Sequence, residues 1–355
     1  MTEPAARARD VLARMPKTEL HLHLEGTVTP ETLWDLADRA GVPLPAESPE
    51  ALRATYVFDS FAVFLELWLA MHACFVDAAA YERMVDDFIA DCRRQNLRYA
   101  EVHFTPYNHE HLGKFGGRAA VEVVAERLQR AEQAGGPVVR MIFDIPSEFL
   151  PASGDYTASL VEQLANPTLV AIGMGGPEID HPRSRAAPFF ERARRAGYPV
   201  VSHAGETGPA EHVRQAVVEL KVRRVQHGVH AVDDPTVLAL LADYGIPCDV
   251  ALTSNLLLTT FRDLATHPIR QLLAAGVPVT LSTDDPAFFN TDLTREYELA
   301  HTVVGLSLEE LWNINLDGLR YGLADIALRR QLMQEFIAEG ESLGLAAGSG
   351  VACGG

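Results

Sequence analysis

The stretch ELHLHLEG (residues 19–26) places His21 and His23 two positions apart among leucines. Side chains two apart on a β-strand point to the same face, so both imidazoles are expected on one side of a strand. Seven further short, apolar or β-branched runs follow along the chain, separated by amphipathic helical segments. That alternation is typical of βα units and a parallel sheet.

Eight such runs are enough to close a barrel, with one helix or more between successive strands. The sequence therefore predicts an α/β fold, a TIM-type (β/α)8 barrel. The runs expected as strands are 19–24, 98–104, 138–145, 169–174, 199–203, 224–227, 248–252 and 277–282.

A single barrel of this type accounts for most of the 355 residues, so residues 1–343 are expected to form one domain. The segment PETLWDLADRAG (30–41) is expected to be helical, with a proline near its start and Gly41 at its end. Two more helical patterns make an insertion at about 57–95, after the first strand, which we expect to cover the barrel mouth. The Gly-rich residues 344–355 are expected to be a disordered tail.

The formal net charge of −18 argues against nucleic acid or an anionic membrane surface as a partner. No run of about 18 apolar residues could span a bilayer, and acidic residues near the start argue against an export signal. A cytoplasmic location is the resulting expectation. The cysteines lie far apart without a C-x-x-C pair, so they predict neither a disulfide framework nor a thiolate metal site.

Polar side chains collect where several predicted strands end. The fifth strand ends in VSHAGE, with His203 and Glu206, and the sixth ends in VQHG, with His227. The eighth ends in LSTDDP, with Asp284 and Asp285. Because TIM barrels carry their catalytic groups at the carboxyl ends of the strands, these side chains are expected to converge with the histidines of the first strand.

Imidazole nitrogens with one carboxylate are a suitable ligand set for Zn²⁺, which in catalytic sites keeps one position open for water. A bound water then loses its proton near pH 7 instead of near a pKa of ~15.7. His227 and Asp285 remain to orient that hydroxide, and Glu206 to act on the substrate. The expected ligands of one Zn²⁺ per chain are His21, His23, His203 and Asp284.

The motifs HLHLEG, GMGGPE, HAGE, QHG and TDDP occur in the order and spacing of the adenosine deaminase family, which the chain resembles from about residue 16 to 343. The resemblance implies zinc-dependent hydrolytic deamination of a 6-aminopurine nucleoside, adenosine to inosine plus ammonia. It implies that Glu206 protonates ring N1, while His227 and Asp285 position the hydroxide at C6. A carboxylic acid there neutralises charge as it forms on the ring.

The same resemblance suggests substrate contacts. Gly176 would donate its backbone N–H to N3, Asp285 would also contact N7, and His23 would lie against the substrate as well as the metal. Glu25 matches a carboxylate that meets the sugar, with a solvated loop acid as the alternative. Phe58, Phe61 and Phe64 are expected either to touch the purine or to fill the core.

Some residues depart from the family pattern. Residues 249–255 read DVALTSN where the family usually shows Glu-x-Cys-Pro-x-Ser-Asn. His103 replaces a common arginine, and Gln226 replaces a glycine. We expect these changes to lie near the mouth and to alter substrate choice. The other histidines, on predicted helices and loops, are expected mostly at the surface.

Alternatives remain open at this stage. Adenosine is the first expectation, with 2'-deoxyadenosine, adenine and 6-aminodeoxyfutalosine as alternatives that differ at N9. Another amidohydrolase acting on an amide, lactam or ester bond, or a nucleoside-binding protein without turnover, would also fit parts of the pattern. A cytidine-deaminase type does not fit, because PCDVA lacks the second cysteine of P-C-x-x-C. The sequence gives no oligomeric state.

Overall fold

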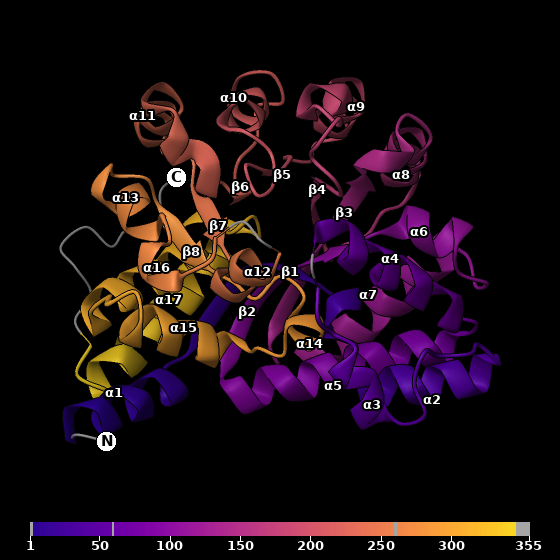
Figure 1. The fold of residues 1–355 in the computed structure, drawn as a ribbon, viewed down its shortest axis with the longest axis horizontal. Coiled ribbons are helices and arrows are strands. Elements are labelled where there is room, and N and C mark those ends of the chain that lie inside the picture. The colour runs from indigo at the N-terminus through magenta and orange to yellow at the C-terminus, as the bar shows by residue number, and fades with distance from the viewer. Residues whose placement is uncertain (1–2, 59, 259–260, 346–355) are drawn as a thin grey trace.

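The computed structural model describes residues 3–58, 60–258 and 261–345, coloured along the chain in Figure 1. All eight predicted strands are present in the expected order, and every pairing between neighbours is parallel. The strands are β1 Lys17–His23, β2 Leu97–Phe104, β3 Val138–Pro146, β4 Leu169–Gly175, β5 Ser202–Ala204, β6 Val225–His227, β7 Cys248–Val250 and β8 Val279–Leu281.

The strands form two sheets of four, β1 to β4 and β5 to β8, which meet at two seams. At one seam Leu22 bridges Asp284, and at the other Ile172 bridges Val200. Backbone bonds support both contacts: the N–H of His23 donates to Asp284 O at 2.8 Å, and that of Ile172 donates to the carbonyl of residue 199 at 3.1 Å. The predicted barrel is therefore confirmed.

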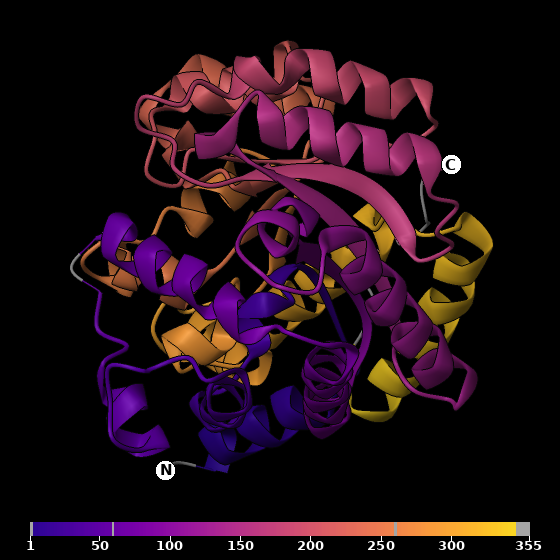
Figure 2. The ribbon, with the colours of Figure 1, turned by 90° about the vertical axis from the view of Figure 1, so that its right-hand side faces the viewer.

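Helices surround the strands, as Figures 1 and 2 show from two directions. The helices before β5 are α1 Glu3–Arg14, α2 Pro30–Ala40, α3 Pro49–Ala54, α4 Phe61–Met71, α5 Ala78–Gln95, α6 Pro106–His111, α7 Gly117–Gln133, α8 Ala152–Gln163 and α9 Ala187–Arg195. Those after β5 are α10 Ala210–Val218, α11 Pro235–Tyr244, α12 Leu252–Leu257, α13 Ile269–Ala274, α14 Pro286–Phe289, α15 Leu293–Thr302, α16 Leu308–Tyr321 and α17 Ile326–Ser342. None of the described helices is long and apolar enough to cross a membrane.

Helix α2 begins and ends where the sequence predicts. Its N-cap Thr29 accepts a hydrogen bond from the N–H of Thr32, and Pro30 occupies the first turn, where a missing N–H costs nothing. Gly41 ends the helix in the left-handed region, with φ of 65°.

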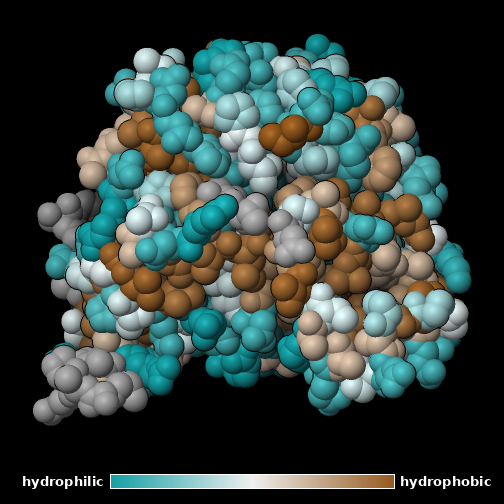
Figure 3. Space-filling view, viewed as in Figure 1, coloured by the Kyte–Doolittle hydropathy of each residue, from teal (hydrophilic) through white to brown (hydrophobic). Residues whose placement is uncertain are grey.

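The insertion between β1 and β2 divides into two parts with different places. Helix α4 is apolar on most of its surface and leaves Val63 47% exposed. Figure 3 shows apolar residues across the middle of this face, where Figure 1 places α4, α12 and α14. Helix α5 instead packs against α7 and β2 as an ordinary outer helix. The expectation that both cover the mouth is correct for α4 and wrong for α5, whose single apolar stripe faces the barrel wall.

The predicted tail at 344–355 falls almost entirely outside the described residues. Leu345, which is described, is buried against the core.

A buried cluster of charges inside the barrel ties several strands together. The Arg224 guanidinium at the start of β6 is fully buried between two carboxylates, 2.7 Å from Glu101 Oε2 on β2 and 2.9 Å from Asp249 Oδ2 on β7. It also donates to the carbonyl of Leu20 on β1 at 3.2 Å. This one side chain therefore bonds to three other strands.

We expect Arg224→Met to destabilise the protein by about 3–5 kcal/mol, because it leaves two buried carboxylates without their cation. Urea unfolding followed by circular dichroism would measure the loss. The matched control is Arg98→Met, which breaks a surface pair with Glu335 and Glu339 and should cost about 0–1 kcal/mol. Equal losses in the two variants would contradict the structural role of Arg224.

Candidate active site

Four side chains meet at the carboxyl end of the barrel. His21 and His23 come from the end of β1, His203 from β5, and Asp284 from the turn after β8. The Nε2 atom of His203 lies 3.0 Å from Nε2 of His21 and 3.1 Å from Nε2 of His23. Asp284 Oδ1 lies 3.3 Å from Nε2 of His21 and 3.4 Å from Nε2 of His23. The structure thus brings all four predicted ligands together.

These spacings fit a metal ion better than they fit hydrogen bonds. Ligands about 2.0–2.1 Å from a tetrahedral zinc are about 3.3 Å from one another, which matches the measured separations. The three imidazoles cannot all satisfy one another, because each neutral ring has one N–H and one acceptor nitrogen. A divalent cation would take all three lone pairs and the carboxylate oxygen at once. The four residues therefore have the donor types and the spacing to hold a metal.

Outer contacts orient these ligands. The Nδ1 atom of His21 is 3.2 Å from Asp249 O, and Nδ1 of His203 is 2.9 Å from Met174 O. Donation to backbone carbonyls leaves both Nε2 lone pairs directed at the shared point. The hydroxyl of Ser254, on α12, donates to Asp284 Oδ2 at 2.7 Å and leaves Oδ1 toward the histidines.

Two residues of the site have strained backbones. His227 ends β6 with φ of 61°, and Asp284 has φ of 66°. This left-handed region costs a residue with a Cβ roughly 1–3 kcal/mol, and it persists where surrounding contacts fix it. In both cases the strand turns sharply at its carboxyl end and directs the side chain into the barrel mouth.

Glu206 is held by another buried acid, Glu178, at the end of the GMGGPE motif. Glu178 accepts backbone N–H bonds from Gly205, Glu206, Thr207 and Gly208, at 2.7 to 3.2 Å. Burial raises the pKa of Glu178, but the hydrogen bond from His212, the charge of Arg183 and the backbone donors outweigh burial and hold this pKa at about 2. The fixed carboxylate therefore shapes the loop that carries Glu206.

Glu206 itself is electrostatically unusual. Burial, followed by the negative charge of Asp284 and Glu178, raises the pKa of Glu206 well above its ordinary value. Its Oε1 is buried without a hydrogen-bond partner, and its Oε2 lies 3.6 Å from Nε2 of His227. A protonated carboxyl is thus favoured beside the predicted ligands.

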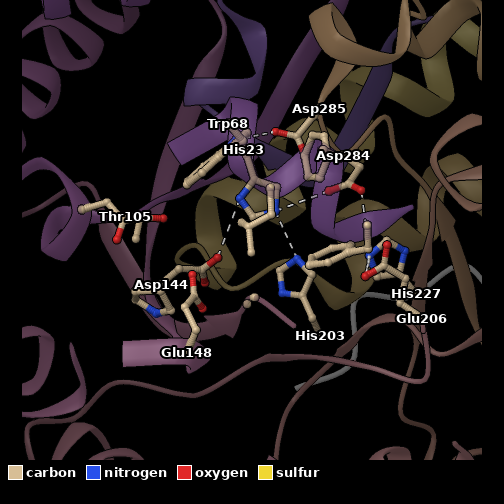
Figure 4. Close-up of a pocket in the computed structure, with 17 residues that line it drawn as sticks. His23, Trp68, Thr105, Asp144, Glu148, His203, Glu206, His227, Asp284 and Asp285 are labelled. Carbon is tan, nitrogen blue, oxygen red and sulfur yellow. Dashed lines mark hydrogen bonds and ion pairs between the residues drawn. The ribbon is translucent and has the colours of Figure 1, made fainter. Parts of the chain in front are cut away.

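A pocket opens above these groups, with about 530 Å³ of space including its mouth. Figure 4 shows His23, His203 and Asp284 directed toward one another, with Glu206 and His227 at one side and Asp144 and Glu148 at another. Asp285 also lines it and accepts a hydrogen bond from the Trp68 indole of α4 at 2.9 Å. Gly175 and Gly176 form part of its wall.

The remaining predicted residues have varied positions. Gly176 lies in the pocket wall with φ of 83°, and a Cβ there would be 2.3 Å from Glu148 Oε2. Glu25 is fully buried and bonded to Thr105 N–H at 2.8 Å, so the alternative of a solvated loop acid is wrong. It is not among the residues described as lining the pocket, and its Oε2 has no hydrogen-bond partner.

The aromatic residues divide between the two expectations for them. Phe61 and Phe64 line the pocket, whereas Phe58 packs against Phe64 and Phe289 in the core.

The departures from the family pattern do not line the pocket. Asp249 and Gln226 belong to the buried cluster around Arg224, and His103 bonds to Asp144 at 2.9 Å below the pocket surface. Ala251 and Leu252 are fully buried. None of these positions therefore faces the pocket directly, and His103 approaches it only through Asp144, which lines the pocket. Their effect on substrate choice stays a prediction.

Sequence reasoning missed several residues that support the site. Glu178 ends the GMGGPE motif, and Ser254 and Asn255 end the segment DVALTSN. The hydrogen-bonding capacity of these side chains was the signal in the sequence that could have identified them. Trp68, Asp144 and Glu148 lie outside any motif. Among the histidines expected at the surface, four are buried: His72, His109, His212 and His267.

Comparison with known proteins agrees with this geometry. The family model described as adenosine deaminase matches residues 16–339. An aminodeoxyfutalosine deaminase of Streptomyces coelicolor is 35% identical over 326 residues, which are 91% of this chain and 84% of the relative. The crystal structure of an adenine deaminase from Arthrobacter aurescens superposes with a TM-score of 0.88 and 29% identity, covering 92% of this chain and 99% of that one.

A zinc-bound amidohydrolase structure from Burkholderia ambifaria superposes with a TM-score of 0.87 and 26% identity, covering 97% of this chain and 94% of that one. Barrel and site together define a hydrolase of the amidohydrolase type. Within that class, the chain belongs to the adenosine deaminase family.

We expect Asp284→Ala to lose its bound metal, because only three neutral imidazoles remain to compensate the charge of a divalent ion. Metal per chain, measured by elemental analysis after loading with zinc and desalting, should fall from a single ion to a small fraction. Asp285→Ala is the control, since it removes the neighbouring carboxylate, which is outside the predicted ligand set. Full metal content in Asp284→Ala would exclude this carboxylate as a ligand.

Proposed function

We propose that this protein hydrolyses the C6 amino group of a 6-aminopurine and releases ammonia. The observation that carries the proposal is the convergence of three imidazoles and one carboxylate beside a buried acid, Glu206, inside one pocket. The relatives named as aminodeoxyfutalosine and adenine deaminases support the reaction class.

We further propose that the metal is a single Zn²⁺ held by His21, His23, His203 and Asp284. Support comes from the measured donor spacings, from the N and O ligand types, and from a similar structure that contains zinc. Zinc supplies Lewis-acid activation of the attacking water.

Glu206 acts on the ring in this proposal. Attack at C6 places negative charge on the purine, and proton donation to N1 neutralises it as it forms. The raised pKa of Glu206 suits a group that must carry a proton near neutral pH. Its unpartnered Oε1 is free to face the substrate.

His227 and Asp285 position the attacking water in this proposal. Burial lowers the pKa of His227 to about 3, so its ring is neutral, and its Nε2 has no partner in the protein. Asp285 is fixed by the Trp68 indole and can contact both the water and N7. Gly176 and His23 both line the pocket, and in this proposal the Gly176 N–H donates to N3 while His23 lies against the substrate.

The N9 substituent is the finer question. Among the described residues that line the pocket, none is Lys or Arg, and five are acidic: Asp144, Glu148, Glu206, Asp284 and Asp285. A phosphate group would therefore meet acidic side chains with no Lys or Arg beside them to bind it. We propose a free base or a nucleoside without phosphate. The relatives support adenine and aminodeoxyfutalosine ahead of adenosine, which was our first expectation from the sequence.

We expect zinc-loaded protein to release ammonia from at least one of adenine, adenosine, 2'-deoxyadenosine and aminodeoxyfutalosine, and not from AMP. Glu206→Gln should keep its zinc and lose turnover by about 100-fold or more, because an amide cannot supply the proton. An enzyme-coupled ammonia assay measures both. Binding without ammonia release would favour a silent nucleoside-binding protein, and activity on amides or lactams alone would favour a different amidohydrolase.

We expect Gly176→Ala to raise KM for the substrate by about 10-fold, which corresponds to the loss of roughly one hydrogen bond. The new Cβ displaces Glu148 and strains the backbone that presents the N–H. Steady-state kinetics at saturating zinc measures the change. Gly197→Ala is the matched control, because Gly197 has φ of 92° but open space around it. A similar KM in both variants would contradict a substrate contact at Gly176.

A further inference from the structure

The ring of His227 is connected, on the side away from the pocket, to a short chain of buried groups. Its Nδ1 lies 3.1 Å from Nδ2 of Asn255, on α12. The Oδ1 atom of Asn255 lies 3.1 Å from Nε2 of His267, and the N–H of Ile269 donates to Nδ1 of that second histidine at 3.2 Å. All four residues are buried.

The backbone N–H of Ile269, at the far end of this series of hydrogen bonds, fixes which partner donates in each of them. The Ile269 N–H begins α13 and can only donate, so Nδ1 of His267 must be the acceptor. Burial lowers the pKa of His267 to about 3, so the ring is neutral and carries its single proton on Nε2. That proton is donated to Asn255 Oδ1.

The side-chain amide of Asn255 then determines which nitrogen of His227 accepts a hydrogen bond. With its oxygen engaged by His267, Asn255 presents its NH₂ group to Nδ1 of His227, which must accept. The proton of a neutral His227 therefore lies on Nε2, facing the pocket. Rotating the amide by 180° would set the Ile269 N–H against an Nδ1–H of His267 and leave a buried donor unpaired, at a cost of about 1–3 kcal/mol.

We propose that Asn255 and His267 are positioning residues that hold His227 in its Nε2–H tautomer. In that form Nε2 has no lone pair, so His227 donates a hydrogen bond to the oxygen of the attacking water and does not accept its proton. This goes beyond the proposed function, because it fixes the direction of one bond whatever the N9 substituent is.

The surroundings of His227 Nε2 suit donation of a hydrogen bond to the attacking water. Nε2 of His227 is buried without a partner, 3.6 Å from Glu206 Oε2 and 3.9 Å from Asp284 Oδ2. Both of these residues carry oxygens that can accept a hydrogen bond, and so does the attacking water. An N–H on Nε2 of His227 that faces the pocket therefore has acceptors within reach. A lone pair on Nε2 could not bond to the ionised Asp284 carboxylate, which only accepts hydrogen bonds.

The test is ¹⁵N NMR of the zinc-loaded, full-length protein labelled at histidine, with His227→Gln to identify the signals of His227. Protonated and unprotonated ring nitrogens resonate far apart, so the tautomer is read directly and without any assay of turnover. We expect the proton of His227 on Nε2 in the wild type. A proton on Nδ1 overturns the proposal, even if the enzyme deaminates every substrate tested.

Two variants complete the experiment. Asn255→Asp is nearly isosteric, but its carboxylate accepts a bond and so draws the proton of His227 to Nδ1. Turnover should fall about 10- to 100-fold with zinc content unchanged. His267→Gln keeps an N–H donor for Asn255 and should keep the wild-type tautomer and activity within a few-fold. An unchanged tautomer in Asn255→Asp would overturn the proposal, and if that variant does not fold, the wild-type and His267→Gln spectra decide.

Discussion

The seam between β1 and β8 is the contact on which the site depends. Leu22 bridges Asp284 there, and the N–H of His23 donates to the carbonyl of Asp284. Because the two segments lie more than 260 residues apart along the chain, only closure of the barrel brings the carboxylate beside the paired histidines. The strained φ of Asp284 is sustained by this contact. Barrel closure and ligand assembly are thus the same structural event.

Closure also has an electrostatic consequence. The mouth gathers several buried carboxylates, and the lower barrel gathers Glu101 and Asp249 around Arg224. Inside the barrel the protein supplies its own cation. At the mouth, none of the described pocket-lining residues is Lys or Arg, so the positive charge has to come from elsewhere. A divalent ion would complement this arrangement. Burial together with the neighbouring carboxylates raises the pKa of Glu206 beside the predicted ligands.

Much of this could be predicted from the sequence, for a physical reason. Strand periodicity predicts all eight strands, and the rule that catalytic groups lie at strand ends predicts that His21, His203 and Asp284 lie together. The missed residues act from outside that rule. Trp68 reaches Asp285 from an inserted helix, and His267 reaches the site only through Asn255. Contacts of this kind depend on how loops fold back over the barrel. The spacing of apolar residues along the sequence does not predict how those loops fold.

The segment after β7 supports the site from behind the pocket. Ala251 and Leu252 are buried away from the pocket, while Ser254 and Asn255 in the same segment hold Asp284 and His227. The loop therefore serves the chemistry and tolerates new packing residues beside it. The pocket wall itself is completed by α4 and by the segments after β2 and β3, which contribute Phe61, Asn108 and Glu148 to its lining. These three residues are outside the predicted ligand set, so this part of the wall and the predicted metal site are built from different segments of the chain.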